Sequence, residues 1–173
     1  MPAQLSAESP LTLLTDLYQR TMAQAYCQSG LAEREAVFHL FFREAPFGSG
    51  YAVSCGQQPA LDFLEGFGFQ NDDLDYLRTL GGNDDRPLFE EGFLQMLGAM
   101  ELQVQVDAMP EGTVAFAQQP ILRVQGPLLQ CQLLETPLLN LVNFQTLVAT
   151  KAARICMATG DKPVLEFGLR RAQ

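Results

Sequence analysis

The chain has 173 residues, 47% of them hydrophobic and 18% charged, and its formal net charge is -9. This length suits one domain with a real core, but not a complete eight-stranded α/β barrel, which takes about 250 residues. The acidic balance argues against non-specific binding to nucleic acid or to an anionic membrane, and no apolar run approaches the roughly 18 residues of a membrane span.

The N-terminal stretch lacks the basic and apolar regions of a secretory signal, so we expect a cytoplasmic protein. A helix is predicted from Thr12 to about Gly30, because apolar residues recur on one side and Gly30 is a favourable stop. Asp16 and Tyr18 lie in its first turns, where polar side chains can reach over a neighbouring site. The alternative interpretation, and on these residues alone the more common one, is an ordinary solvated helix face.

The middle of the chain is predicted to alternate short helices with short strands. Residues 36–42 are rich in aromatics and read as a strand, with 51–54 returning as its antiparallel partner. The other predicted elements are helices at 58–67, from 71 onward and at 88–97, and strands at 101–106, 113–116 and 120–125. These strands indicate an antiparallel sheet that packs one face on the helices.

The sequence carries no strong metal-binding pattern. Its four cysteines are scattered without a Cys-x-x-Cys pair, so we expect free thiols in a reducing compartment. His39, the one histidine, is expected on the polar face of its strand rather than as a catalytic base. A site on Asp72, Asp73 and Asp75 is an alternative to their capping of a helix that begins with Asn71, but the calcium-loop pattern is absent.

The last forty residues contain the strongest pattern. Apolar residues recur at helical spacing through 134–155, which predicts one long helix that begins near 126–128. Residues 164–167 form an apolar run of strand length, and Arg170 and Arg171 follow. Phe167 with these two guanidinium groups can hold an aromatic ring that bears a carboxylate, or a phosphate. Tandem arginines are more often solvated or paired with acids, so this signal alone is weak.

These segments closely resemble the nicotinate phosphoribosyltransferase family. The C-terminal motifs are LLETPLL at 133–139, ATKAAR at 149–154 and EFGLRRAQ at 166–173. LTDLYQRTMAQAY at 14–26, FFR at 41–43, PFG at 46–48 and GPL at 126–128 follow the family's order. The resemblance covers nearly the whole chain, and since family members are much longer, it is to their N-terminal portion.

The resemblance implies a fold and a domain division. We expect an α+β class, with an N-terminal helical and antiparallel-sheet domain at 1–160. Residues 161–173 would be the first strand of an incomplete, type II phosphoribosyltransferase-like α/β barrel. Active sites of barrels lie at the C-terminal ends of the strands, which is where Phe167, Arg170 and Arg171 would stand.

The resemblance also implies the substrate-binding residues. Phe167 would stack on the pyridine ring and Arg170 would hold anionic groups, with Arg171 completing the pair in a less defined role. Tyr18 would come from a neighbouring subunit to cover the other face of the ring, with Asp16 beside it. The site would be shared across a head-to-tail homodimer.

The implied reaction joins nicotinate to phosphoribosyl pyrophosphate, with Mg2+ and with ATP as co-substrate. No catalytic residue and no metal ligand is expected within these 173 residues, and we expect residues 1–173 alone to be inactive and to bind neither cofactor. Two alternatives stay open: a related enzyme acting on nicotinamide or quinolinate, and a non-catalytic interaction module.

Overall fold

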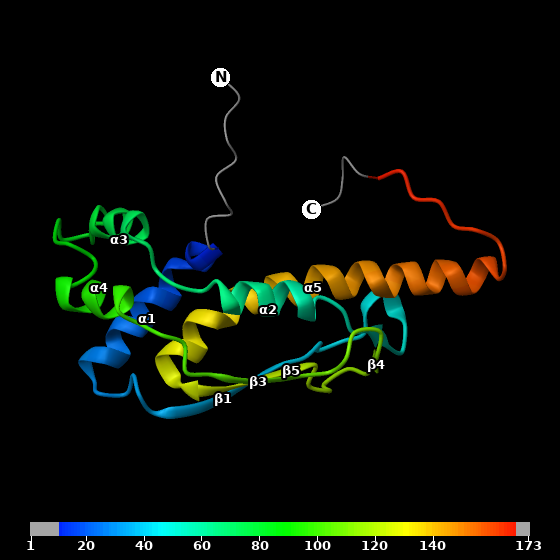
Figure 1. Cartoon of the computed structure of the whole chain (residues 1–173), viewed down its shortest axis with the longest axis horizontal. Helices are drawn as coiled ribbons and strands as arrows, with labels where there is room; N and C mark the ends of the chain where they lie inside the picture. The colour runs from blue at the N-terminus through cyan, green and yellow to red at the C-terminus, as the bar shows by residue number, and fades with distance from the viewer. Residues whose placement is uncertain (1–10, 169–173) are drawn as a thin grey trace, which may run out of the picture.

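The computed structural model describes residues 11–168, in which helices and antiparallel sheets combine into one α+β arrangement (Figure 1). The long helix α5 (Leu128–Thr159) runs along most of the molecule, and the other elements gather mainly around its first half. This confirms the α+β class and the long helix predicted from 126–128. No helix of the described residues is long and apolar enough to cross a membrane.

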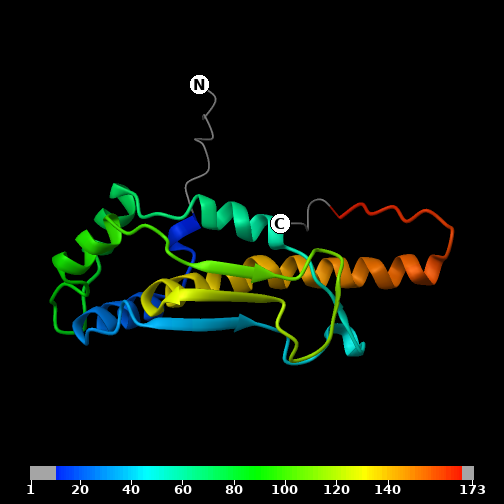
Figure 2. The same cartoon turned by 60° about the horizontal axis from the view of Figure 1, so that its bottom comes forward.

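A three-stranded antiparallel sheet packs on one side of α5. Its order is β1 (Glu35–Leu40), β5 (Leu122–Pro127) and β3 (Gln105–Ala108), so β5 is central and β1 is an edge strand. The register pairs Leu40 with Leu122 and Phe38 with Val124. Because side chains alternate across a strand, these residues meet α5 while His39 and Arg123 lie on the outer face. Figure 1 shows the sheet beneath the helix, and Figure 2 shows its strands side by side in front of it.

The strand predicted at 51–54 does not return along 36–42. Instead β2 (Ala52–Val53) pairs with β4 (Val114–Ala115) in a separate two-stranded ladder, after the 3-10 turn η2 (Pro46–Gly48). Buried hydroxyl groups of α5 hold this segment: the Val53 N–H donates to Thr150 Oγ1 at 2.8 Å, and Thr146 Oγ1 donates to the Cys55 carbonyl at 2.9 Å. These bonds to a helix explain why β2 lies away from β1.

Four shorter helices complete the described fold, after a 3-10 turn η1 (Leu11–Leu13). They are α1 (Leu17–Gln28), α2 (Gln57–Glu65), α3 (Asn71–Arg78) and α4 (Glu91–Gly98). One hydrophobic core lies between the sheet, α2 and α5, and a second joins α1, α3 and α4 to the start of α5. Thus α5 contributes to both cores, through Leu134 and Val142 in one and Leu133 in the other.

Helix α5 contains Pro137 and remains one element. Proline lacks the N–H that would bond the carbonyl four residues earlier, so it bends a helix where it occurs inside one. Figure 1 shows the first turns of α5 at an angle to the rest. This bend brings the N-terminal turns of α5 against α1.

Residues 164–167 form no strand, which corrects the prediction made for them. After α5 ends at Thr159, the chain turns and runs back beside the helix (Figures 1 and 2). A strand is defined by hydrogen bonds to a neighbouring strand, and this segment faces side chains of α5 instead. The domain division at residue 160 and the barrel remain predictions.

Candidate functional site

The start of α1 presents Asp16 and Tyr18 at the surface. The helix begins at Leu17, later than predicted, and Asp16 is the residue before it, with extended backbone angles and no hydrogen bond from its carboxylate to the helix end. Tyr18 is 53% exposed. Both side chains are exposed, which leaves their role in binding a ligand a prediction.

Asp16 and Tyr18 line one groove, which we call the α1–α5 groove. It has a cavity volume of about 430 Å3 and lies between the start of α1, the end of β1 and α5. The lining side chains are those of Asp16, Tyr18, Leu40, Phe41, Phe42, Arg43, Glu135, Thr136, Leu139, Asn140 and Asn143. It combines aromatic and aliphatic surface with amides, carboxylates and one guanidinium group, a mixture suited to a flat polar ring.

Arg43 is the cationic side chain of this lining, and sequence reasoning missed it. From the sequence, Arg43 is counted within the FFR motif at 41–43 and given no ligand-binding role. Its position directly after the strand, within the FFR motif, was the signal that it could stand at the mouth of a groove. A guanidinium group there can bind a carboxylate or a phosphate through paired hydrogen bonds.

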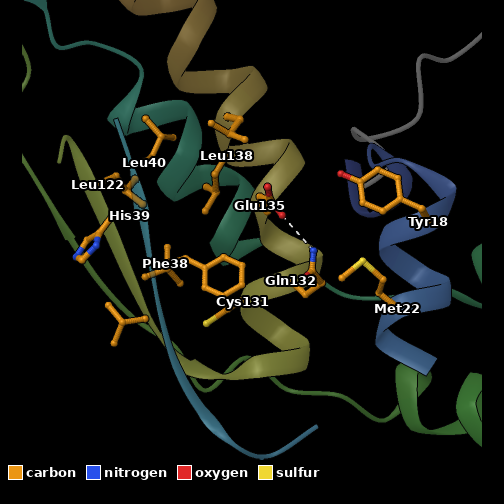
Figure 3. A pocket seen from close by; sticks show the side chains of 13 residues that line it. Tyr18, Met22, Phe38, His39, Leu40, Leu122, Cys131, Gln132, Glu135 and Leu138 are labelled. Atoms are coloured by element: carbon orange, nitrogen blue, oxygen red, sulfur yellow. Dashed lines mark hydrogen bonds between the residues drawn. The ribbon is translucent and has the colours of Figure 1, made fainter. Parts of the chain in front are cut away.

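A second cavity of about 430 Å3 adjoins the first beside edge strand β1, and Tyr18 and Glu135 line both (Figure 3). Its walls are mostly apolar, with Met22, Phe38 and Leu138 among them. His39 points away from α5, so it lies on the polar face of its strand as predicted.

The cysteines are free thiols, as predicted. Cys131 lies in the wall of the β1 cavity, where burial raises the pKa of its thiol. A raised pKa reduces the thiolate fraction at neutral pH, so Cys131 is a weak nucleophile there. Its side chain packs in the hydrophobic core that forms the wall of the cavity.

Phe167 stands apart from Tyr18 within one chain. Its side chain is 86% exposed on the segment that follows α5. Neighbouring Val164, Glu166 and Gly168 line a third cavity, of about 680 Å3, with α5 side chains from Phe144 to Cys156. From Glu135, near Tyr18, to Phe144, the first α5 residue of this cavity, is roughly 14 Å along a helix that rises 1.5 Å per residue. Arg170 and Arg171 lie outside the described residues.

Within residues 11–168, no group of three or more His, Cys, Asp or Glu side chains could hold a metal ion. Two of the three aspartates weighed as a metal site have structural partners. Asp73 Oδ2 accepts from the Gln70 N–H at 2.9 Å, and Asp75 pairs with Arg78 at 2.7 Å. Helix α3 begins at Asn71 as predicted, but its capping residue is Gln70 rather than Asn71 or an aspartate, and Asp72 and Asp73 lie in the first turn, where the helix dipole favours acids.

Comparisons with known proteins agree on one family. The family model for the nicotinate phosphoribosyltransferase (NAPRTase) N-terminal domain matches residues 13–143. Nicotinate phosphoribosyltransferase of Bacillus subtilis (strain 168) is 46% identical over 165 residues, which cover 95% of this chain and 32% of the relative. The Homo sapiens nicotinate phosphoribosyltransferase is 46% identical over 173 residues, covering 99% of this chain and 31% of the relative.

Comparison with solved structures also finds nicotinate phosphoribosyltransferase. The crystal structure of human nicotinic acid phosphoribosyltransferase matches with a TM-score of 0.81 and 45% identity, over 92% of this chain and 32% of that one. Nicotinate-nucleotide pyrophosphorylase from Pyrococcus furiosus has a TM-score of 0.70 at 21% identity, over 100% of this chain and 36% of that one, which shows a shared fold. The chain spans about a third of the length of the curated relatives that it matches.

Proposed function

Because the chain belongs to the nicotinate phosphoribosyltransferase family, we propose that the protein containing it joins nicotinate to phosphoribosyl pyrophosphate and forms nicotinate mononucleotide. The observation that carries this proposal is the family match over residues 13–143, a range that includes Asp16 and Tyr18. The product would enter NAD biosynthesis, and the protein would act in the cytoplasm.

The proposed site uses surfaces from two copies of the chain. Tyr18 covers one face of the pyridine ring, and Phe167 of a second copy stacks on the other, with Arg170 and Arg171 of that copy holding anionic groups. The separation of Tyr18 from the segment that carries Phe167 within one chain supports this sharing. Arg43 adds a guanidinium group on the Tyr18 side of the ligand.

In the proposed reaction, the pyridine nitrogen donates its lone pair to the anomeric carbon of the ribose. The bond from that carbon to the pyrophosphate oxygen breaks, and pyrophosphate leaves with the bonding electrons. The ring nitrogen becomes cationic, and the carboxylates of Asp16 and Glu135 in the groove wall favour this charge. Holding the pyridine ring between two aromatic faces, with its nitrogen in line with the ribose carbon, would supply much of the acceleration.

Mg2+ and ATP belong to the proposal for the complete protein. The described residues do not fit a metal site, as stated above, so no step is assigned to the ion here. We infer that both are bound by other parts of the protein. This chain would supply the ring-binding surface and the two carboxylates beside it.

An assay of the complete protein with nicotinate, nicotinamide and quinolinate tests this function. We expect nicotinate to be preferred, and Tyr18→Ala to raise the KM for nicotinate by more than about tenfold, because it removes both the stacking ring and its hydroxyl group. Tyr76→Ala is the matched control, because Tyr76 is equally exposed, at 53%, on α3. A preference for another pyridine, or an equal effect of the two substitutions on this KM, would contradict the proposal.

A further inference from the structure

A buried set of polar side chains lies behind Tyr18 and joins α1 to α5. Gln19 is 0% exposed and Gln132 is 5% exposed. Gln19 Nε2 lies 3.0 Å from Glu135 Oε2, 3.1 Å from the Tyr18 hydroxyl oxygen and 3.3 Å from Thr136 Oγ1, so its two hydrogens are shared among three acceptors. Gln132 Nε2 donates to Gln19 Oε1 and, at 3.1 Å, to Glu135 Oε2. Buried amides are stable here because each has partners.

Glu135 sets the direction of these hydrogen bonds. A carboxylate accepts and does not donate, so both glutamines must turn their NH2 groups toward it. This fixes which amide atom is nitrogen, an assignment that shape alone would leave ambiguous. Gln132 Oε1 then accepts from the Tyr26 hydroxyl at 3.3 Å, and the Gln19 NH2 group meets the phenol oxygen of Tyr18.

The phenol oxygen of Tyr18 therefore accepts a hydrogen bond from inside the protein. Its own hydrogen takes no part in that bond and stays available to a partner in the cavities that Tyr18 lines. Accepting one hydrogen bond polarises a hydroxyl and strengthens the bond that it donates. Figure 3 shows the Tyr18 hydroxyl directed toward α5, on the side where Gln132 and Glu135 lie.

We propose that Gln19, oriented by Glu135 and Gln132, is a positioning residue that holds the Tyr18 phenol in place and leaves its O–H to donate to an anionic oxygen of the ligand. This rests on the proposed function, in which Tyr18 covers the pyridine ring of nicotinate. Tyr18 is half exposed, and a loose phenol would lose side-chain entropy each time a ligand bound. A phenol already held by Gln19 avoids much of that cost.

The position of Tyr18 can be observed without activity. We would place 3-fluorotyrosine at position 18 of the complete protein and compare its 19F NMR signal among variants. Gln19→Met and Glu135→Gln, both close in volume to the native side chains, are expected to shift and broaden the signal. The matched control is Gln24→Met, because the Gln24 amide on the same helix bonds the Leu88 carbonyl and the Glu90 N–H instead.

Kinetics give the second measurement. Gln19→Met should raise the KM for nicotinate about tenfold, the effect of one lost hydrogen bond, with kcat and the KM for phosphoribosyl pyrophosphate within about twofold. Tyr18→Phe should have the same effect, and adding Gln19→Met to Tyr18→Phe should have almost none. A merely structural role for Gln19 would instead give effects that multiply, because it would not act through the Tyr18 hydroxyl.

The two measurements separate the two proposals. An unchanged 19F signal in Gln19→Met, or multiplying effects on the KM, would overturn the positioning role. If the native protein made no nicotinate mononucleotide, the proposed function would fail while the 19F comparison still decided whether Gln19 holds Tyr18. If Gln19→Met did not fold, Glu135→Gln would carry the test, since it keeps the volume and removes the group that sets the hydrogen-bond direction.

Discussion

Gly56 shows how one backbone position fixes the segment between β2 and α2 against α5. Its φ of +99° is a conformation that side chains with a Cβ rarely adopt. A Cβ there would lie 3.0 Å from Gln145 Cβ, the Leu141 carbonyl oxygen and Val142 Cα. Two of these atoms are helix backbone, which cannot easily move.

Gly56→Ala should therefore lower the free energy of unfolding by about 1–3 kcal/mol, through strained φ and contact with α5. Urea denaturation measures this change. Gly92→Ala is the control: nothing lies within 4 Å of a Cβ there and Gly92 is in α4, so stability should stay unchanged or rise by up to about 1 kcal/mol. Equal losses in the two variants would mean that close packing against α5 is not the cause.

Single residues also show what sequence could and could not predict about the site. The exposure of Asp16 and Tyr18 follows from their place at the start of a helix, which periodicity and stop signals located within a few residues. The bond from Gln19 to Glu135 joins residues 116 positions apart, and no local pattern contains that information. The same holds for Arg43, which reaches the groove only because β1 packs beside α5.

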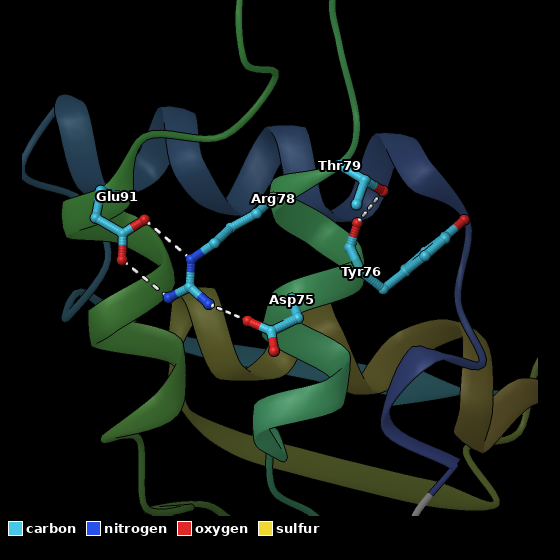
Figure 4. A network of polar contacts seen from close by, with 5 residues as sticks. All are labelled: Asp75, Tyr76, Arg78, Thr79 and Glu91. Atoms are coloured by element: carbon cyan, nitrogen blue, oxygen red, sulfur yellow. Dashed lines mark hydrogen bonds and ion pairs between the residues drawn. The ribbon is translucent and has the colours of Figure 1, made fainter.

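Arg78 links two short helices, α3 and α4. Figure 4 shows its guanidinium group between Asp75 of its own helix and Glu91 at the start of α4. Arg78 Nε and Nη2 donate to the two Glu91 oxygens at 3.1 and 2.9 Å, and Nη1 donates to Asp75 at 2.7 Å. The hydrogen bonds from Arg78 lower the pKa of Glu91.

Because the pKa of Glu91 is lowered, the contribution of the Arg78–Glu91 pair to stability depends on pH. A carboxyl with a lower pKa in the folded than in the unfolded state stabilises the fold above its unfolded pKa, about 4.3 for Glu, and that contribution is lost as pH falls through the folded value. Arg78→Met should lower the urea midpoint slightly at pH 7, because the pair is exposed to solvent. The difference in urea midpoint between Arg78→Met and the native protein should shrink below about pH 4.

Arg86→Met is the control for this measurement, since Arg86 meets Asp84 only at 3.7 Å and is largely exposed. Its urea midpoint should follow that of the native protein at every pH. An Arg78→Met effect of constant size from neutral to acid pH would show that the contribution of Arg78 does not depend on the ionised carboxylates.

Helices were more predictable than strands for a physical reason. The long helix and α2, α3 and α4 follow from apolar periodicity and from caps within their own sequence. A strand depends on a distant partner. Strands β2 and β4 are two residues each, and the segment that contains β2 is held partly by the hydroxyls of Thr146 and Thr150. Their pairing was predicted wrongly because that docking is a tertiary effect.

Across the full molecule, the α+β arrangement could be predicted, but the path of the chain after α5 could not. Residues 164–167 have the composition of a strand and no strand beside them among the described residues. Phe167 is left 86% exposed, and Leu165 is also exposed. Large exposed apolar side chains next to a groove are typical of surface that another protein segment or a ligand covers.

A site shared between subunits predicts a specific activity for dimers that combine two different variants. Consider a dimer of one Tyr18→Ala chain and one Phe167→Ala chain. If each of its two sites is built from both chains, one site carries both substitutions. The other site keeps both native aromatic rings. A site built within one chain would be damaged at both positions.

The most direct test of the central claim is therefore the nicotinate mononucleotide activity of the complete protein after Tyr18→Ala and Phe167→Ala chains are co-expressed in equal amounts. With nicotinate held well below its KM, a tenfold or larger rise in KM leaves each parent with about a tenth of the native rate or less. Random pairing makes half of the dimers hybrid with one native site each, so we predict that the hybrids recover about a quarter of the native activity. Activity no higher than that of the parents, in samples shown by mass spectrometry to contain hybrid dimers, would contradict a pyridine site shared between the first helix of one copy and the tail of another.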